Sequence, residues 1–222
     1  MENAGQEVML FYIVCDESAS MATNGGIETI NQSLPELHAT LVSDPLVVDK
    51  SRLSIIAFSD TAEVILPMSK ATEIQDMPGV TENASTSYGA AFNTLRQAIE
   101  ADVNGLKSQG YRVFRPCVFF ITDGDPTDDN WEAAYDSLMS HQYRPHIIAY
   151  GVDGATVDTL KRIGNLKAFM GVDRVMAAKA LSSMMTSIGN TVVNSVSQVG
   201  PSGGGTIVVP PPPNGVVDLD EL

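Results

Sequence analysis

The chain has 222 residues, of which 44% are hydrophobic and 18% are charged, so its composition is that of a globular domain with a sizeable core. Asp and Glu number 27 against 13 Lys and Arg, which gives a net charge of −14. An acidic surface repels phosphate backbones and anionic lipids, so the charge argues against nucleic acid or a membrane as a partner and favours a basic or mixed protein surface.

The first predicted strand covers residues 8–15 and ends in the acidic, hydroxyl-rich turn Asp16-Glu17-Ser18-Ala19-Ser20. In extended chain, residues i, i+2 and i+4 project to one side, so Asp16, Ser18 and Ser20 can converge on one point. One carboxylate with neutral hydroxyls suits Mg²⁺, which prefers oxygen ligands and keeps several waters. The same pattern also occurs as a helix N-cap and turn, so by itself it leaves both interpretations open.

A helix and a hairpin follow this turn. Apolar residues at helical spacing predict a helix over residues 26–42, with Pro35 as a kink inside it. The apolar runs 53–58 and 62–66 flank the turn 59–61 and predict a hairpin. The hairpin gives the sheet one antiparallel edge strand.

A second strand end carries a second carboxylate. The loop 83–92 is rich in small residues, opens a helix predicted over 88–106 and contributes the hydroxyl of Thr86. The apolar run 115–122 then ends in Asp123 and further acidic residues. If this run and the first strand are parallel neighbours, Asp16 and Asp123 meet at the carboxyl edge of the sheet, where open α/β sheets bind ligands.

The remaining elements continue the alternation of helix and strand. We predict a helix over 131–139, a strand over 146–151, a helix over 156–163, a strand over 168–170 and a closing helix over 177–196. Right-handed crossovers then give an α/β fold of the doubly wound, Rossmann-like type. Its central sheet is mostly parallel with one antiparallel edge strand, and helices cover both faces.

The three motifs, in this order and setting, resemble the metal-ion-dependent adhesion site of the von Willebrand factor A family. The resemblance implies that Ser18, Ser20 and Thr86 contact a cation directly or through water, while Asp16 and Asp123 supply charge, often through bridging waters. Two positions where the family usually has Gly carry Ala19 and Ser85, and neither is a ligand. Residues 120–128 further resemble the intracellular bacterial branch that includes the tellurite-resistance protein TerY.

The resemblance implies a non-catalytic, metal-dependent protein-binding module. Its cation, Mg²⁺ or else Mn²⁺ or Ca²⁺, is short of one ligand and accepts an Asp or Glu carboxylate from a partner protein. The TerY-like branch implies an adaptor or scaffold in bacterial signalling or stress response, with a kinase or phosphatase as partner. The alternative is a Mg²⁺-dependent phosphoryl-transfer or receiver-type domain. Such a domain needs an aspartyl acceptor or a second Asp two residues after Asp16, where Ser18 stands.

The C-terminal residues differ in composition from the rest. We expect residues 1–199 to form the domain and residues 200–222 a flexible, Gly- and Pro-rich acidic tail. A disordered tail and a peptide docked on a partner are both open. A third possibility is that a tail carboxylate fills the metal position; the candidates are Asp218, Asp220, Glu221 and the terminus of Leu222.

Other residues point to compartment and helix capping. Cys15 and Cys117 lie in predicted buried strands, where reduced cysteine is the default. The acidic, polar N-terminal residues lack the features of a secretory signal, so we expect a cytoplasmic protein. The carboxylates of Asp125, Asp128 and Asp129 either form an acidic rim that selects a basic partner or, for the last two, cap the helix predicted from residue 131.

Overall fold

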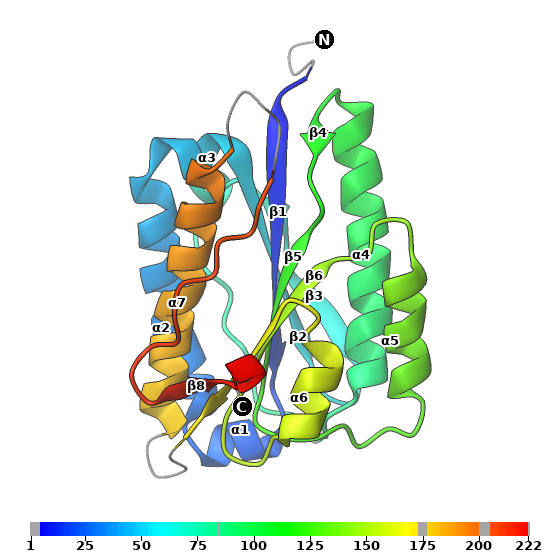
Figure 1. Ribbon diagram of the computed structural model, residues 1–222, viewed down its shortest axis with the longest axis vertical. Coiled ribbons are helices and arrows are strands. Elements are labelled where there is room, and N and C mark those ends of the chain that lie inside the picture. Colours follow the sequence, from blue (N-terminus) through cyan, green and yellow to red (C-terminus); the bar gives the residue numbers. More distant parts are fainter. Residues whose placement is uncertain (1–4, 84, 173–176, 200–204, 222) are drawn as a thin grey trace.

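The computed structural model describes residues 5–83, 85–172, 177–199 and 205–221. Its centre is an eight-stranded sheet (Figure 1). The strands are β1 (Glu7–Asp16), β2 (Ser51–Phe58), β3 (Ala62–Ser69), β4 (Arg112–Val113), β5 (Cys117–Thr122), β6 (His146–Gly151), β7 (Lys167–Gly171) and β8 (Val216–Asp218). They follow the order β3-β2-β1-β5-β6-β7-β8, and the short β4 pairs with β1.

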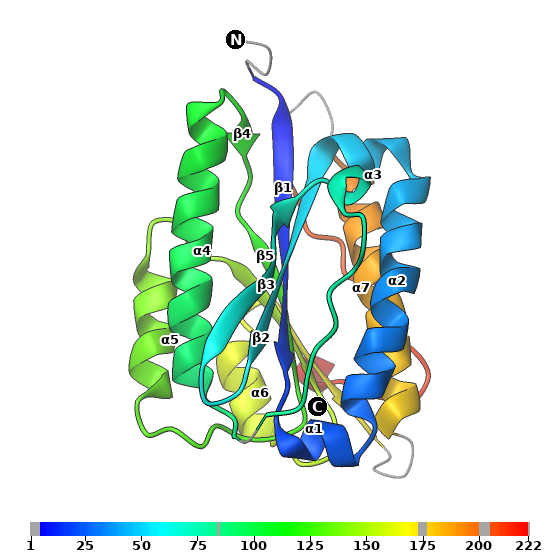
Figure 2. The ribbon, with the colours of Figure 1, turned by 180° about the vertical axis from the view of Figure 1, so that it is seen from behind.

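Helices cover both faces of the sheet, as Figures 1 and 2 show. The helices are α1 (Ala19–Thr23), α2 (Gly26–Ser43), α3 (Pro45–Lys50), α4 (Tyr88–Ser108), α5 (Trp131–Ser140), α6 (Val157–Ile163) and α7 (Ala177–Ser197), with 3₁₀ turns η1 (Ala71–Glu73) and η3 (Leu219–Glu221). Helices α2, α3 and α7 pack on one face, and α4, α5 and α6 on the other. The predicted doubly wound α/β fold is therefore confirmed.

The central strands are apolar along their whole length because both faces are covered. In β1, Phe11 and Ile13 pack in the core under α2 and α7, whereas Leu10 and Tyr12 pack in the core under α4. Cys15 and Cys117 are buried and free, as predicted. Among the described residues, no helix is both long enough and apolar enough to span a bilayer.

The sheet has antiparallel pairs at both ends. The predicted hairpin is present, since β2 and β3 pair antiparallel, and Pro35 lies inside α2 as expected. The second pair, between β7 and β8, was not predicted. The short helices α1 and α3 were also missed, because five or six residues carry too little periodicity to mark a helix.

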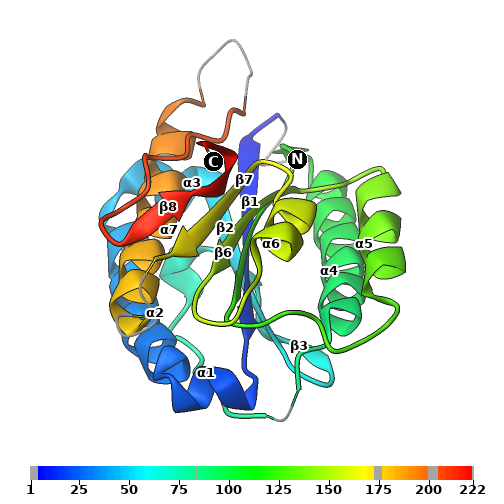
Figure 3. The same cartoon turned by 60° about the horizontal axis from the view of Figure 1, so that its bottom comes forward.

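The prediction of a disordered tail is wrong for residues 205–221. This segment, which we call the C-terminal strap, runs back beside α7 and adds β8 to the sheet (Figure 3). The side chains of Val216 and Leu219 are buried, and the Lys167 ammonium lies 2.7 Å from a carboxylate oxygen of Asp218. Asp218 is therefore engaged within the fold. Residues 200–204 of the predicted linker, and Leu222, lie outside the described residues.

The packing of the strap can be tested at Leu219, which is 1% exposed. We expect Leu219→Ala to lower the free energy of unfolding by about 2 to 4 kcal/mol, because truncation of a buried leucine removes apolar burial and leaves a cavity. Glu221→Ala, at an exposed position in the same turn, is the matched control and changes stability by less than about 0.5 kcal/mol. Urea unfolding measures both; equal, negligible effects would mean that the strap does not pack.

Candidate metal centre

The candidate metal centre lies at the carboxyl ends of two neighbouring strands, at the end of the sheet where Figure 1 shows α1. Strands β1 and β5 are parallel, and Cys15 pairs with Ile121 in their register. The next residues along the two strands, Asp16 and Thr122, therefore lie side by side, with Asp123 just beyond. This is the adjacency that the two acidic strand ends predicted.

Asp16 is completely buried and is held by its neighbours on both strands. The Ser18 amide donates to Asp16 Oδ1 at 2.9 Å, which closes the turn after β1. The Thr122 hydroxyl donates to Asp16 Oδ2 at 2.6 Å, which ties the end of β5 to the end of β1. The orientation of this carboxylate is thus fixed from two sides.

The hydroxyls of Ser18 and Ser20 gather on Asp123. The Ser20 hydroxyl donates to Asp123 Oδ1 at 2.8 Å, and the Ser18 hydroxyl lies 3.5 Å from the same oxygen. The two serine oxygens are 3.0 Å apart. Ser18 and Asp123 are buried, whereas Ser20 is exposed, so the cluster reaches the surface at Ser20.

Asn24 completes the surroundings of Asp123, and the sequence analysis missed it. Its amide Nδ2 donates to Asp123 Oδ2 at 2.6 Å, and its Oδ1 accepts from the Gly26 amide at 2.9 Å. Asn24 follows α1 and links the start of α2 to the site. A single Asn after an unrecognised five-residue helix gives no sequence signal for this role.

Thr86 lies at the same edge through its backbone. Its carbonyl accepts from the Thr127 amide at 2.9 Å and from the Thr127 hydroxyl at 3.1 Å, which fixes the loop before α4 against the loop after Asp123. The Thr86 hydroxyl makes no hydrogen bond within the described part of the chain. The structure therefore joins Asp16, Ser18, Ser20 and Asp123 by direct contacts or short chains of contacts, and it brings Thr86 to the adjoining loop.

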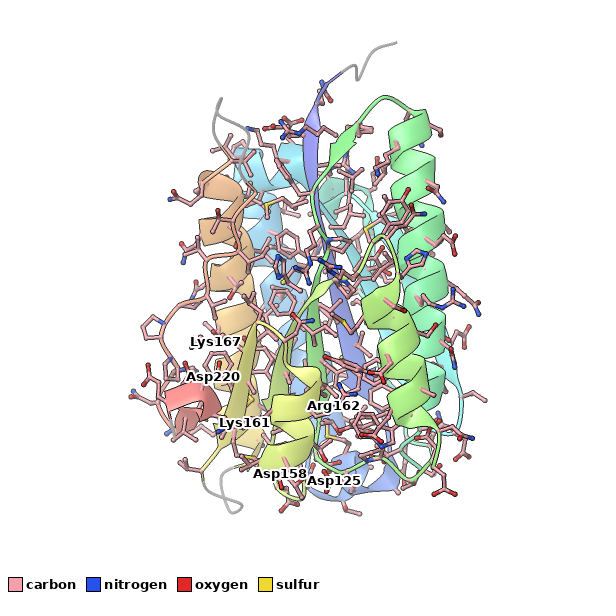
Figure 4. The ribbon with its side chains drawn as sticks, turned by 45° about the vertical axis from the view of Figure 1, so that its right-hand side comes forward. Asp125, Asp158, Lys161, Arg162, Lys167 and Asp220 are labelled. Carbon is pink, nitrogen blue, oxygen red and sulfur yellow. The ribbon has the colours of Figure 1, made fainter. Side chains whose placement is uncertain are left out.

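Two carboxylates of the predicted acidic rim are used inside the fold. Asp128 accepts from the amides of Tyr88 and Gly89, both at 2.9 Å, and so caps α4. The prediction that it caps the helix from residue 131 is wrong, because the loop carries its side chain to the other helix. A Cβ at Gly89 would lie 2.4 Å from the carboxylate, so a larger residue would displace the Asp128 side chain. Asp125 accepts from the Thr156 amide and hydroxyl at the start of α6 (Figure 4).

The electrostatics of the site call for a cation. Burial raises the pKa of Asp16 to about 6, although hydrogen bonds from Thr122 and Ser18 oppose the shift. Burial also raises the pKa of Asp123, and the nearby Asp153 carboxylate adds to it. Neither Asp16 nor Asp123 forms an ion pair with a described Lys, Arg or His. Buried carboxylates without such a partner are costly unless a bound cation compensates them.

The available donors fit a hard divalent cation. Carboxylate and hydroxyl oxygens are the ligands that Mg²⁺, Mn²⁺ and Ca²⁺ prefer. Within the described ranges, no group of three or more His, Cys, Asp or Glu side chains could hold a metal. Any cation at this edge would therefore need hydroxyl oxygens in addition to the two aspartates.

The fold and this edge define a class of protein: an α/β domain whose parallel strand ends bring carboxylates and hydroxyls together at one edge. Residues 11–188 match the model of the von Willebrand factor type A domain, and the chain belongs to this family. The receiver-type alternative is thereby left without support. No curated protein matches the chain.

Solved structures with the same fold are distant in sequence. Proximal thread matrix protein 1 from the mussel byssus, with a zinc-occupied MIDAS motif, has a TM-score of 0.60 and 16% identity over 84% of this chain and 48% of that chain. The von Willebrand factor type A protein from Catenulispora acidiphila has a TM-score of 0.57 and 15% identity over 82% and 43%. The pilus adhesin SpaC from Lactobacillus rhamnosus GG, in its open conformation, gives 0.60 and 12% over 84% and 31%. The chain thus spans half or less of these proteins.

The buried charge of Asp16 is expected to lower the stability of the metal-free protein while it contributes to metal binding. Its pKa of about 6 in the folded protein exceeds the ordinary value of 3.8, so the ionised carboxylate lowers stability above pH 6 and the penalty disappears as the pH falls towards 4. We expect Asp16→Asn to raise the free energy of unfolding of the metal-free protein at pH 7 by about 1 to 3 kcal/mol.

Urea unfolding with and without Mg²⁺ measures the stability of the metal-free protein and its increase on metal binding. We expect Mg²⁺ to stabilise the wild type and to have no effect on Asp16→Asn. Asp129→Asn removes an exposed carboxylate and is the control, with little change in either condition. A variant at position 16 that is less stable than the wild type at pH 7 without metal would show that its charge is compensated in the fold.

Proposed function

We propose that the chain is a non-catalytic, metal-dependent protein-binding module whose cation is held by Asp16, Ser18, Ser20, Thr86 and Asp123. The observation that carries this proposal is the contact of the Ser20 hydroxyl with Asp123 beside the buried Asp16. In the part of the chain that the structure describes, no basic side chain forms an ion pair with either carboxylate. Mg²⁺ is the proposed cation, with Mn²⁺ and Ca²⁺ as the other oxygen-seeking candidates.

The residues of the chain have distinct roles in this proposal. Asp16 and Asp123 supply the negative charge, and their hydrogen bonds to Thr122, Ser20 and Asn24 hold the oxygens in place before a ligand arrives. The neutral hydroxyls of serine and threonine leave a bound cation with positive charge, so that it can accept a carboxylate from a partner protein. The exposure of Ser20 leaves this side of the site open to such a partner.

We further propose an adaptor or scaffold role in bacterial signalling or stress response, in the cytoplasm, with a kinase or a phosphatase as the partner. The resemblance of residues 120–128 to the TerY-like branch supports this role. Support for a binding function in general comes from the neighbours, whose names describe a thread matrix protein with a zinc-occupied MIDAS motif and a pilus adhesin.

Calorimetric titration with Mg²⁺ and Mn²⁺ tests the proposed metal site. We expect binding to the wild type and a loss of at least about tenfold in affinity for the double variant Ser18→Ala/Ser20→Ala, because two oxygen ligands are removed. Thr23→Ala removes an exposed hydroxyl from the same short helix and is the matched control. Equal metal affinity in the double variant and the control would contradict the proposed ligands.

The role of the cation in partner binding needs a second measurement. Once a partner is known, its affinity is compared in Mg²⁺ and in chelator, for the wild type and for the double variant. We expect binding only for the wild type in Mg²⁺. A partner that binds equally well in chelator would mean that the domain is a metal-independent scaffold, even if the metal titration succeeds.

A further inference from the structure

We propose that a groove at the opposite end of the sheet from the metal centre is a binding site for a phosphorylated small molecule. The last turn of α4, the connection from β4 to β5 and the connection from α5 to β6 form this groove. In Figure 1 these segments lie in the upper half of the view, whereas α1 lies at the bottom. Neither the family match nor the metal centre accounts for the residues gathered there.

The groove has the size and lining of a ligand site. Its volume is about 470 Å³, within the range of small-molecule pockets. Its lining includes no Asp or Glu, although the chain has 27 of these residues. The lining residues that carry the argument combine three cations with apolar and aromatic walls: Val103, Lys107, Phe114, Arg115, Tyr143 and Arg144.

Arg115 is held in place by neutral groups. Its Nε donates to the carbonyl of Arg144 at 2.9 Å, and its Nη2 donates to the carbonyl of Pro145 at 2.8 Å. The third nitrogen, Nη1, has no acceptor within the described part of the chain. The guanidinium is therefore fixed on one side and available for an anion on the other, while its charge has no carboxylate beside it.

Lys107 is also positioned without an ion pair to any described carboxylate. Its ammonium lies 4.4 Å from the centre of the Tyr143 ring, a cation–π contact. The ring is oriented in turn, because the Tyr143 hydroxyl donates to Asn104 Oδ1 at 2.8 Å. Arg144 is exposed and pairs with no described acid. Three cations thus face one groove, and none of them forms an ion pair with a described carboxylate.

The charges around the groove favour an anion with more than one negative charge. Burial and the neighbouring Arg144 lower the pKa of Arg115, and burial together with Arg115 lowers the pKa of His146 to about 4, so that this histidine is neutral at pH 7. The carboxylate of Glu100 faces His141 at 3.8 Å and Arg96 at 4.0 Å. The Glu100 carboxylate therefore pairs with Arg96 and His141 and not with Lys107, Arg115 or Arg144.

A dianionic phosphate ester matches three cations better than a single carboxylate does, and bidentate contacts to arginine suit its oxygens. The apolar side chains of Val103 and Phe114 can contact the remainder of the molecule. The net charge of −14 does not forbid this, because at physiological ionic strength charges beyond about 8 Å are largely screened.

Calorimetric titration with AMP and with glucose 6-phosphate, in buffer free of divalent cations, tests the site on the full chain. We expect at least one probe to bind, and Arg144→Gln and Lys107→Gln each to weaken it about tenfold through loss of a charge-assisted contact. Lys161→Gln removes an exposed positive charge from α6 (Figure 4) and is the matched control, with unchanged affinity. Both arginine and lysine variants alter exposed side chains, so the fold is retained.

Three outcomes would overturn the proposal. Neither probe binds; or Lys161→Gln weakens binding as much as Arg144→Gln, which would show attraction by charge alone; or citrate displaces the phosphate ester at equal concentration, which would show no preference for phosphate. Because the titration omits divalent cations, its result is independent of the metal centre.

Discussion

The hydrogen bond from the Thr122 hydroxyl to Asp16 fixes the ends of two neighbouring parallel strands, and the metal centre depends on it. A carboxylate that is fully buried needs donors and a compensating charge. The β1–β5 register supplies one donor, and the turn after β1 supplies the Ser18 amide. No basic side chain in the described ranges supplies the compensating positive charge. The turn that donates the Ser18 amide to Asp16 also directs the serine hydroxyls towards Asp123. The conformation of this one turn therefore brings most of the site residues together.

The parts of this arrangement that are local in sequence could be predicted. A buried parallel strand is a continuous apolar run, so its end is visible, and the carboxyl-edge rule places Asp16 and Asp123 together. Asn24 contacts Asp123, 99 residues away, and Asp128 contacts Gly89, 39 residues away. Both contacts depend on the course of loops, which hydrophobic periodicity does not predict. The loop that carries Thr86 is held through its backbone by Thr127, a contact that the sequence likewise does not reveal.

The C-terminal strap shows why composition misled the sequence analysis. A Pro- and Gly-rich segment cannot build a core of its own, but it can complete an existing one. Strand β7 would otherwise be the open edge of the sheet, and exposed edges are usually covered. Strand β8 covers it, and Lys167 gathers the acidic residues Asp218 and Asp220 against the fold. The amide of Val208 also donates to the hydroxyl of the buried Ser195 on α7, so the strap is hydrogen-bonded to the last helix.

The two ends of the sheet carry opposite chemistry for related physical reasons. At the carboxyl ends of β1 and β5, acidic side chains are buried and have no basic partner among the described residues, which favours a cation at this edge. At the amino ends of β5 and β6, Arg115 and its neighbours are held by carbonyls and an aromatic ring, which makes the groove receptive to an anion. If ion pairs within the chain neutralised the carboxylates at one end and the cations at the other, neither end would attract a charged ligand. The chain has 27 acidic and 13 basic residues, so acids to pair these cations are plentiful. The lack of a carboxylate partner among the described residues is therefore the feature that points to a ligand.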